Sequence, residues 1–554
     1  MLPFIAFTLL IIGAIVIITV INNNQSVKKL RGTLTDGFGK PPALDDDGKP
    51  ESLENLDSIK RYAEYMLDFK PGDWRLDAIT WNDLDMDSIF GRVNVCHSSV
   101  GEEYLYNCLH ELQQDDKDLL KREKLIQYLA QHPEERVAMQ MAFSKVGKEN
   151  FNGLARLIFD VDDRFLKYQW VYTALAVLPI FSVLLFFVHM YVGFIVLFGS
   201  FVANIAVHHK VKNELESEMP AIDYLHLVLG CCRRLCKMQL SETLPIFDEL
   251  RRCFAFFKPV MHRLPASREN TGSMMNFDFL LDYIRILFLL DVRNYNRMVS
   301  VILKQNAEFH GLFKGIGEIE TAICVLNFRL SLPVHSTPVF VGEKHIKYED
   351  LFHPLLATPV ANSGELMNNS LLTGSNASGK STFVKSLALG GVLAQTLYTC
   401  AATRFETRFT WIMTSMVMRD NIYGGDSYFI VEIKSLRRMV ERVKQHPCTC
   451  YIDEILRGTN TVERIAASCA MLEWLSTQNS LCIAATHDIE LTHLLAATYD
   501  NYHFREQVTT DGVMFDYKIK NGPSTTRNAI KLLDVMDFDP EIVRRAEAIA
   551  QQYD

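Results

Sequence analysis

The sequence predicts a mixed fold, in which a helical domain with membrane-spanning helices precedes an α/β nucleotide-binding domain. Apolar residues recur at every third or fourth position over residues 53–165 and 211–330, the period of amphipathic helices. Two long stretches between and before these regions contain no charged residue. Residues 371–382, LLTGSNASGKST, place a Gly-rich loop between an apolar strand and a helix-forming run. That order is the context of a phosphate-binding P-loop.

The P-loop supplies the first half of a candidate nucleotide site. Its glycines let backbone N–H groups turn toward an anion, and the following helix N-terminus adds partial positive charge. Lys380 is placed to reach the β- and γ-phosphates, and the Ser381 hydroxyl to bind Mg²⁺. The alternative is a chance Gly-Lys-Ser turn. The predicted phosphate-binding residues are Gly374, Ser375, Asn376, Ala377, Ser378, Gly379, Lys380, Ser381 and Thr382.

Two later apolar runs end in polar residues that complete such a site. Residues 448–452 predict a strand followed by Asp453, a Mg²⁺ ligand, and Glu454, which positions or activates the attacking water. Residues 481–485 predict another strand, followed by Thr486 and His487. This histidine is placed to sense the γ-phosphate of ATP. The alternative is a histidine in an ordinary turn at the end of a strand.

Composition limits the class of protein. With 554 residues the chain should form more than one domain. Its net charge of −9 and 48% hydrophobic content exclude a strongly basic nucleic-acid binder. Twelve cysteines occur without a CxxC pair or zinc-ligand spacing, which predicts reduced, mostly buried thiols of a cytosolic domain.

Both uncharged stretches are long enough to cross a bilayer. Residues 2–21 predict a signal anchor, with a cleaved signal peptide as the alternative, and the basic residues that follow predict a cytoplasmic C-terminal side. Residues 170–207 predict two short spans that turn near His189 and Met190. Here the alternative is a buried core hairpin. The chain should therefore be an integral membrane protein with three transmembrane helices and a cytoplasmic nucleotide domain.

Several segments resemble the MutS family of DNA mismatch repair ATPases. The P-loop run GSNASGKSTFVKSLALGGVLAQT, the Walker B run YIDEILRGTNTVERIAASCAMLEWL and the run AATHDIELTHL are similar to MutS motifs in family order. The segment GGDSYFIVEIKSL resembles the one whose serine, here Ser427, reaches the γ-phosphate of the partner subunit. A plain helix N-cap is the other interpretation of Ser427. Segments of residues 75–130 and 317–340 resemble the start and end of the MutS core.

The resemblance implies an ABC-type ATPase domain that uses ATP and Mg²⁺ and forms an ATP-dependent homodimer. Val360 stands where the family often places an adenine-stacking Phe, and Tyr517 falls near a second stacking position. A cross-strand core aromatic is the alternative for Tyr517. The implied organisation is a transmembrane anchor (1–24), a linker (25–57), a helical core and lever (58–166), a transmembrane hairpin (167–210), the returning lever and core (211–335) and the ATPase domain (336–554).

Three departures from the family separate two hypotheses for function. Only the anchor and linker precede the core, the hairpin occupies the place of the DNA clamp, and the terminal dimerisation element is largely missing. These favour a membrane-anchored ATPase that couples ATP binding and hydrolysis to lever movement, with the lipid bilayer and an unknown protein as partners. The alternative is a DNA-binding mismatch-repair or recombination ATPase. A basic cluster over residues 251–268 fits phosphate or lipid contacts, or simply a solvated helix face.

Overall fold

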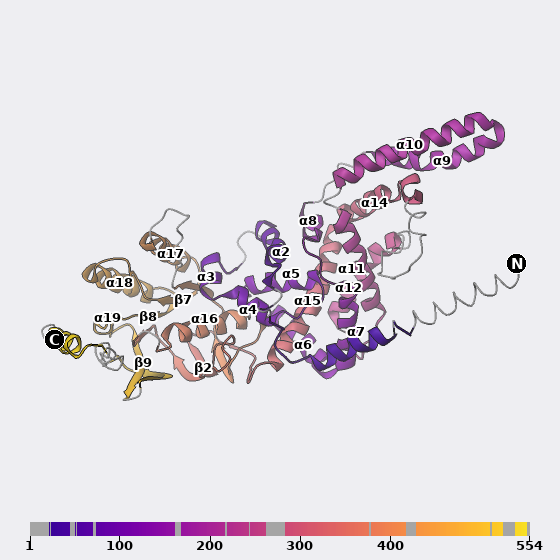
Figure 1. Ribbon diagram of the computed structural model, residues 1–554. Coiled ribbons are helices and arrows are strands. Elements are labelled where there is room, and N and C mark those ends of the chain that lie inside the picture. Colours follow the sequence, from indigo (N-terminus) through magenta and orange to yellow (C-terminus); the bar gives the residue numbers. More distant parts are fainter. Residues whose placement is uncertain are drawn as a thin grey trace.

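The molecule is elongated, with an α/β domain and an apolar hairpin at opposite ends of a helical region (Figure 1). The computed structural model describes residues 21–22, 24–44, 50, 53–69, 74–160, 168–215, 219–242, 244–261, 283–375, 378–416, 428–509, 512–524 and 538–550. Nearly all of the predicted N-terminal anchor lies outside these residues, as do Asn376, Ala377 and Ser427. The mixture of a helical region with an α/β sheet agrees with the fold class that the sequence predicts.

The helical region is built around the crossing of α5 and α15. A Cβ on Gly317 of α15 would lie 2.3 Å from the Tyr104 side chain, and one on Gly101 of α5 would lie 2.3 Å from Glu320. Glycine therefore lets the two backbones approach closely at the centre of the core. The helices are α2 (Leu56–Phe69), α3 (Ala78–Asp83), α4 (Met86–Val93), α5 (Ser99–His110), α6 (Lys117–Gln131), α7 (Pro133–Ser144), α8 (Leu154–Phe159), α9 (Gln169–Val188), α10 (Met190–Leu215), α11 (Met219–Lys237), α12 (Pro245–Met261), α14 (Leu290–Lys304) and α15 (Asn306–Leu330).

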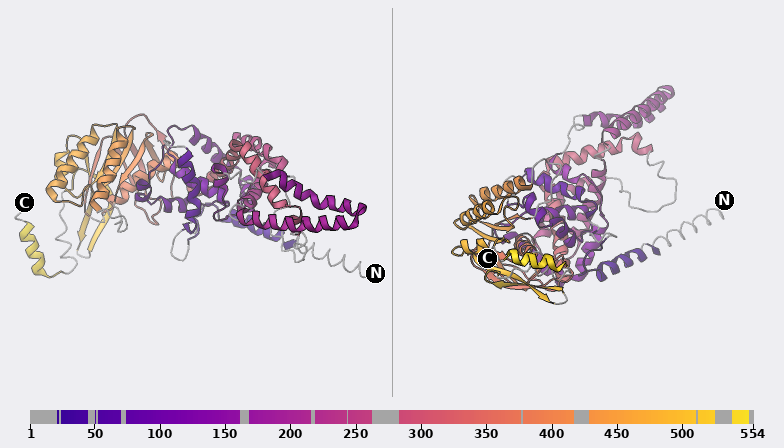
Figure 2. Two further views of the ribbon diagram at one scale, coloured as in Figure 1. Left: turned by 90° about the horizontal axis from the view of Figure 1, so that it is seen from above. Right: turned by 60° about the vertical axis from the view of Figure 1, so that its left-hand side comes forward.

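Helices α9 and α10 form a hairpin that projects from the helical region (Figures 1 and 2). His189 has extended backbone angles and separates the two helices, as the uncharged sequence predicts. In an apolar 18-residue stretch of each helix, only 22% (α9) and 17% (α10) is buried. Phe187 and Tyr191 at the turn are 85% and 82% exposed. Both helices are long and apolar enough to cross a membrane, by length and composition. A core hairpin of a soluble protein would instead bury most of these side chains.

The α/β domain contains two sheets. Strands β1 (Val339–Phe340), β5 (Arg404–Thr407), β2 (Ile346–Leu351) and β3 (Asn362–Leu366) form one in that spatial order. The other has the order β10 (Gly512–Asn521), β9 (Asp500–Thr509), β4 (Ser370–Thr373), β8 (Ser480–Ala485), β7 (Cys448–Asp453) and β6 (Trp411–Ser415). All pairs in this second sheet are parallel except β9 with β10. The helices of this domain are α16 (Lys380–Leu397), α17 (Tyr428–Val443), α18 (Thr461–Ser476), α19 (Glu490–Leu494) and α21 (Pro540–Ala550).

The register of the second sheet brings the predicted motifs together. Ala485 at the end of β8 pairs with Leu372 of β4 on one side and with Asp453 of β7 on the other. Because parallel strands end at the same edge, the segments that follow β4, β7 and β8 lie side by side. These segments are the P-loop, the Asp453-Glu454 pair and the Thr486-His487 pair.

Polar contacts join the helical region to the α/β domain. Asp83 at the end of α3 accepts hydrogen bonds from the Thr414 hydroxyl (2.6 Å) and the Met416 N–H (3.0 Å) next to β6. Arg329 near the end of α15 donates to Thr399 Oγ1 (2.9 Å) and to the carbonyl of Tyr398 (2.8 Å), just after α16. These hydrogen bonds join the α/β domain to the helical region next to β6 and at the end of α16.

Part of the segment that the sequence predicts as a linker, residues 24–36, is helical. The first proline after this helix is Pro41, so no residue in it lacks a backbone N–H for the helix. The chain that follows is also fixed to α15. Asn327 accepts from the Gly39 N–H (2.7 Å) and donates to the Lys40 carbonyl (3.0 Å). The composition of the segment does not reveal these tertiary contacts.

Candidate nucleotide-binding site

The two glycines at the ends of the loop after β4 both have positive φ angles. Gly374 has φ 140° and Gly379 has φ 103°, both in the region that favours glycine. A Cβ on Gly374 would lie 2.7 Å from the Phe504 carbonyl oxygen, so a side chain does not fit there. Helix α16 begins at Lys380, directly after this loop, and its first N–H groups have no partner within the helix.

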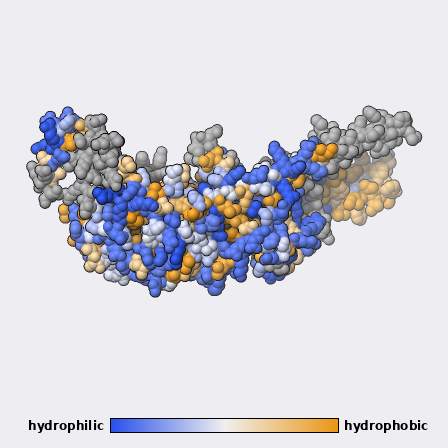
Figure 3. Space-filling view, turned by 90° about the horizontal axis from the view of Figure 1, so that it is seen from below, coloured by the Kyte–Doolittle hydropathy of each residue, from blue (hydrophilic) through white to orange (hydrophobic). Residues whose placement is uncertain are grey.

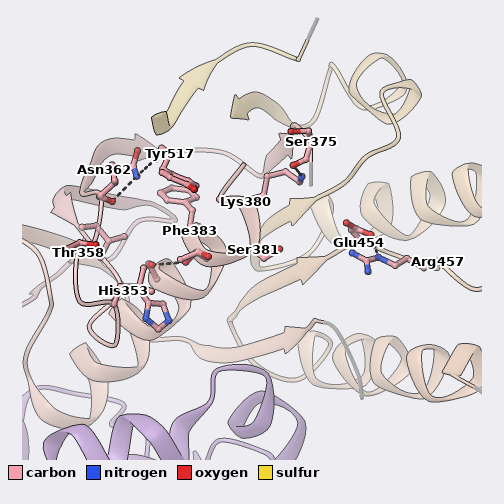
Figure 4. Close-up of a pocket in the computed structure, with 16 residues that line it drawn as sticks. His353, Thr358, Asn362, Ser375, Lys380, Ser381, Phe383, Glu454, Arg457 and Tyr517 are labelled. Carbon is pink, nitrogen blue, oxygen red and sulfur yellow. Dashed lines mark hydrogen bonds and ion pairs between the residues drawn. The ribbon is translucent and has the colours of Figure 1, made fainter. Parts of the chain in front are cut away.

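A cavity of about 560 Å³ opens beside the start of α16 (Figure 4). Its size falls in the range of small-molecule sites. P-loop and α16 residues form one part of it, residues between β2 and β3 another, and the turn after β7 a third. The lining residues are Leu351, His353, Leu356, Thr358, Val360, Asn362, Ser375, Gly379, Lys380, Ser381, Thr382, Phe383, Ser386, Glu454, Arg457 and Tyr517.

Lys380 is the cation at the loop. Its Nζ donates to the carbonyl oxygens of Gly374 (2.6 Å) and Ser375 (2.7 Å), which holds the buried side chain against the P-loop. Ser381 is exposed to the cavity. The structure therefore places an ammonium group and a hydroxyl group beside the N-terminus of α16, where an anion is favoured.

Asp453 has the character of a cation ligand. It is the last residue of β7 and only 3% exposed, and within the described residues neither of its carboxylate oxygens has a hydrogen-bond partner. A buried ionised carboxylate is costly without a positive partner. Hard divalent cations such as Mg²⁺ prefer carboxylate and hydroxyl oxygens, so the donor set of Asp453 and Ser381 fits Mg²⁺.

Glu454 lies between two basic side chains. Its carboxylate forms an ion pair with Arg457 and contacts His487, whose Nε2 is 2.5 Å from Glu454 Oε1. Burial lowers the pKa of His487, and the charges of Lys380 and Arg457 lower it further. The imidazole is therefore neutral near pH 7, and its Nε2 donates its proton to Glu454.

The backbone at Glu454 is also unusual. Its φ is 58°, a left-handed conformation that costs free energy in a residue with a side chain. The N–H of Glu454 is bonded to the Ala485 carbonyl oxygen (2.9 Å), so the turn stays attached to β8. Ala485 thus holds the backbone of Glu454, and Arg457 and His487 hold its carboxylate.

The opposite end of the cavity is more apolar. Leu356 and Val360 line it together with Tyr517, which is 42% exposed and therefore not the core aromatic of the alternative interpretation. The Tyr517 ring lies against Gly379, where a Cβ would be 3.0 Å from its Cδ1. Asn362 holds β10, the strand of Tyr517, by donating to the Tyr517 carbonyl (3.0 Å) and accepting from the Ile519 N–H (2.9 Å).

Several residues that the sequence predicts for a nucleotide site lie together in the structure. The structure brings Lys380, Ser381, Glu454 and Tyr517 to one cavity, with His487 paired to Glu454. The sequence did not indicate that Asn362 holds β10 in place, because an Asn at the start of a strand has no distinctive pattern. The sequence also gave no indication that Arg457 pairs with Glu454, because the two residues lie in an irregular turn rather than on a helix.

Comparisons with known proteins agree with this geometry. Residues 370–554 match the family MutS domain V. The chain is 29% identical over 182 residues to the DNA mismatch repair protein MutS of Thermus aquaticus (33% of this chain, 22% of the relative). It is 31% identical over 233 residues to that of Petrotoga mobilis (39% and 28%). It is 27% identical over 282 residues to MutS protein homolog 4 of Homo sapiens (47% and 30%).

The chain spans less than a third of the length of these relatives. The matched part includes β4, the P-loop, the Asp453-Glu454 pair and His487. The comparisons therefore show that residues 370–554 are similar to MutS domain V, and that up to 47% of the chain is similar to MutS proteins.

Proposed function

We propose that this protein is a membrane-anchored, Mg²⁺-dependent ATPase in which ATP binding and hydrolysis move the helical region. The observation that carries the proposal is the cavity that gathers Lys380, Ser381 and Glu454. Asp453, the residue before Glu454, is buried and has no hydrogen-bond partner for its carboxylate among the described residues. Cation, hydroxyl and carboxylate groups in this arrangement suit phosphoryl transfer to water.

Each residue has a role in this proposal. Lys380 and the N–H groups of the P-loop bind the β- and γ-phosphates. On nucleotide binding, the Lys380 ammonium group gives up its hydrogen bonds to the loop carbonyls and donates to phosphate oxygens instead. Ser381 and Asp453 would hold Mg²⁺, which supplies charge neutralisation to the phosphates when bound. Glu454 orients the attacking water, and His487, already in contact with Glu454, senses the γ-phosphate.

Replacing Glu454 with Gln tests the hydrolytic role. The amide keeps the shape of the side chain but removes the charge that orients or activates water, so the rate should fall by roughly 10²–10⁴-fold. ATP binding, measured with a fluorescent analogue, should persist. Glu365→Gln, which changes an exposed carboxylate on β3, is the matched control. Hydrolysis close to that of the unaltered chain would remove Glu454 from the mechanism.

The exposed apolar hairpin supports the membrane part of the proposal. Few residues in the apolar stretches of its helices are buried, and hydrophobic residues gather at this end of the molecule (Figure 3). An exposed apolar surface of this length is costly in water. Basic residues at both ends of residues 170–207 predict that both ends are cytoplasmic. Carbonate treatment of membranes should leave the full chain in the pellet. Release without detergent would exclude integration.

A DNA-binding repair ATPase is the second candidate, because the relatives named above include DNA mismatch repair proteins. Such a protein would bind duplex DNA with an affinity that falls steeply as salt rises, because phosphate contacts release counterions. We expect no such salt-dependent binding by the detergent-solubilised chain. Binding in the micromolar range or tighter, with a steep salt slope, would favour the second candidate.

A further inference from the structure

A buried carboxylate outside the cavity holds the turn that carries Glu454. Glu432 lies on α17 and is 6% exposed. Its Oε1 accepts a hydrogen bond from the backbone N–H of Leu456, 24 residues later in the sequence. Burial raises the pKa of Glu432, while the Leu456 amide and the Arg457 charge oppose that rise. An apolar residue would avoid this cost of burial, so a carboxylate here indicates that the Leu456 N–H in the turn requires an acceptor.

The turn itself is strained. Glu454 and Leu456 both have φ 58°, and each such residue costs roughly 1–3 kcal/mol unless its surroundings enforce the conformation. The Ala485 carbonyl holds one side of the turn through the Glu454 N–H. Glu432 holds the other side through the Leu456 N–H. The orientation of the Glu454 carboxylate therefore depends on a contact with α17.

Packing between α17 and the turn is close as well. A Cβ on Gly458 would lie 2.8 Å from Cβ of Phe429, in the first turn of α17. Farther along the same helix, Arg438 forms an ion pair with Asp77, the N-cap residue of α3 in the helical region. One helix thus contacts both the turn of Glu454 and the helical region.

We propose that Glu432 is a positioning residue, which holds the Glu454 turn in its strained conformation and makes ATP hydrolysis depend on the position of α17. The inference rests on the proposed ATPase function. It assigns α17 as the element through which movement of the helical region alters the orientation of Glu454. Glu432 itself does not line the cavity and has no direct contact with the nucleotide in this proposal.

Steady-state ATP hydrolysis by the full chain in detergent tests the proposal. Glu432→Ala should lower kcat by a factor of roughly 10–100, because a small misplacement of a reacting group has an effect of that size. KM for ATP should stay within about twofold, because ground-state contacts to the nucleotide are kept. Glu432→Gln should restore most of kcat, because its amide oxygen accepts the same N–H. Glu441→Gln, on the exposed side of α17, is the matched control.

A double variant separates positioning from a general loss of structure. Once Glu454 is Gln, its orientation matters little, so Glu432→Ala should not slow the Glu454→Gln chain further. If the folded Ala variant keeps the kcat of the unaltered chain, or slows the Glu454→Gln chain by its full factor, the proposal is wrong. Should the Ala variant not fold, Glu432→Asp, one methylene shorter, replaces it with the same expected loss. Absence of ATP hydrolysis by the unaltered chain overturns the proposed function and this inference together, whereas normal Glu454 dependence without Glu432 dependence overturns the inference alone.

Discussion

Replacement of Glu320 by Gln should change how the stability of the helical region depends on pH. Glu320 on α15 is 2% exposed, and burial raises its pKa from 4.5 to about 7. Its carboxylate accepts hydrogen bonds from the His97 N–H (2.7 Å), the Ser98 N–H (3.3 Å) and the Ser98 hydroxyl. These donors lower the pKa but do not outweigh burial, and the nearby Glu102 raises it further.

The sign of the effect follows from proton uptake on folding. Between pH 4.5 and 7 the folded chain holds a proton on Glu320 that the unfolded chain has lost. The stabilisation from this proton is complete below pH 4.5 and disappears as the pH rises through about 7. The shift corresponds to about 3 kcal/mol in the free energy of unfolding, since one pKa unit is about 1.4 kcal/mol.

Gln at position 320 is uncharged at every pH and keeps an oxygen that accepts the same backbone N–H groups. The variant should therefore exceed the unaltered chain in stability by up to about 3 kcal/mol at pH 8, and the difference should shrink by about 1.4 kcal/mol per pH unit below pH 7. Urea unfolding of the detergent-solubilised chain, followed by circular dichroism at several pH values, measures this difference. A difference that is constant with pH, or a less stable variant at pH 8, would refute the reasoning.

Two further predictions concern the dimer and the core. If Ser427 completes the site of a partner subunit, mixing a Ser427→Arg chain with a Lys380→Ala chain should restore ATP hydrolysis that each chain lacks alone; a mixture as inactive as its parents, despite proven heterodimers, would contradict the shared site. Gly317→Ala should destabilise the chain by about 1–3 kcal/mol, because the added methyl overlaps Tyr104 at the α5–α15 crossing. An unfolding midpoint in urea equal to that of the unaltered chain would show that the crossing adjusts without cost.

Patterns that are local in sequence predicted much of this fold and site. The strand before Gly374 and the helix from Lys380 are local features, and so are the strands that end at Asp453 and Ala485. Parallel pairing then brings their ends together without further information. The hairpin was also predictable, because charge-free length is a property of composition.

Residues that act through distant partners were not predictable in this way. In the sequence, nothing distinguishes Glu320 and Glu432 from glutamates on a helix surface. Both are nevertheless buried, and each accepts a hydrogen bond from a backbone N–H of another segment. The donors to Glu320 lie more than two hundred residues away in the sequence. The contacts that fix the chain after the helix over residues 24–36 to α15 were missed, because they depend on tertiary packing.

A continuous series of contacts links the nucleotide cavity to the base of the hairpin. Helix α16 begins at Lys380 in the P-loop and ends beside Tyr398, whose carbonyl oxygen accepts from Arg329 of α15. Helix α15 has 25 residues, which corresponds to a length of about 37 Å. At its far end, Asn306 donates to the Ile158 carbonyl (2.8 Å), and α14, which precedes it, packs against α9 of the hairpin.

The stiffness of this connection decides what it can transmit. Arg329 is buried and paired with Glu123 of α6 (2.6 Å), so its guanidinium is fixed to the helical region. Moving Tyr398 and Thr399 away from it would break two hydrogen bonds to a buried charged group, each worth about 1.5–3 kcal/mol. A shift of α16 on nucleotide binding would therefore carry α15 with it. Because α15 is one helix from this contact to α14, the shift would reach the hairpin as a rigid-body movement, which is the movement that the proposed function requires.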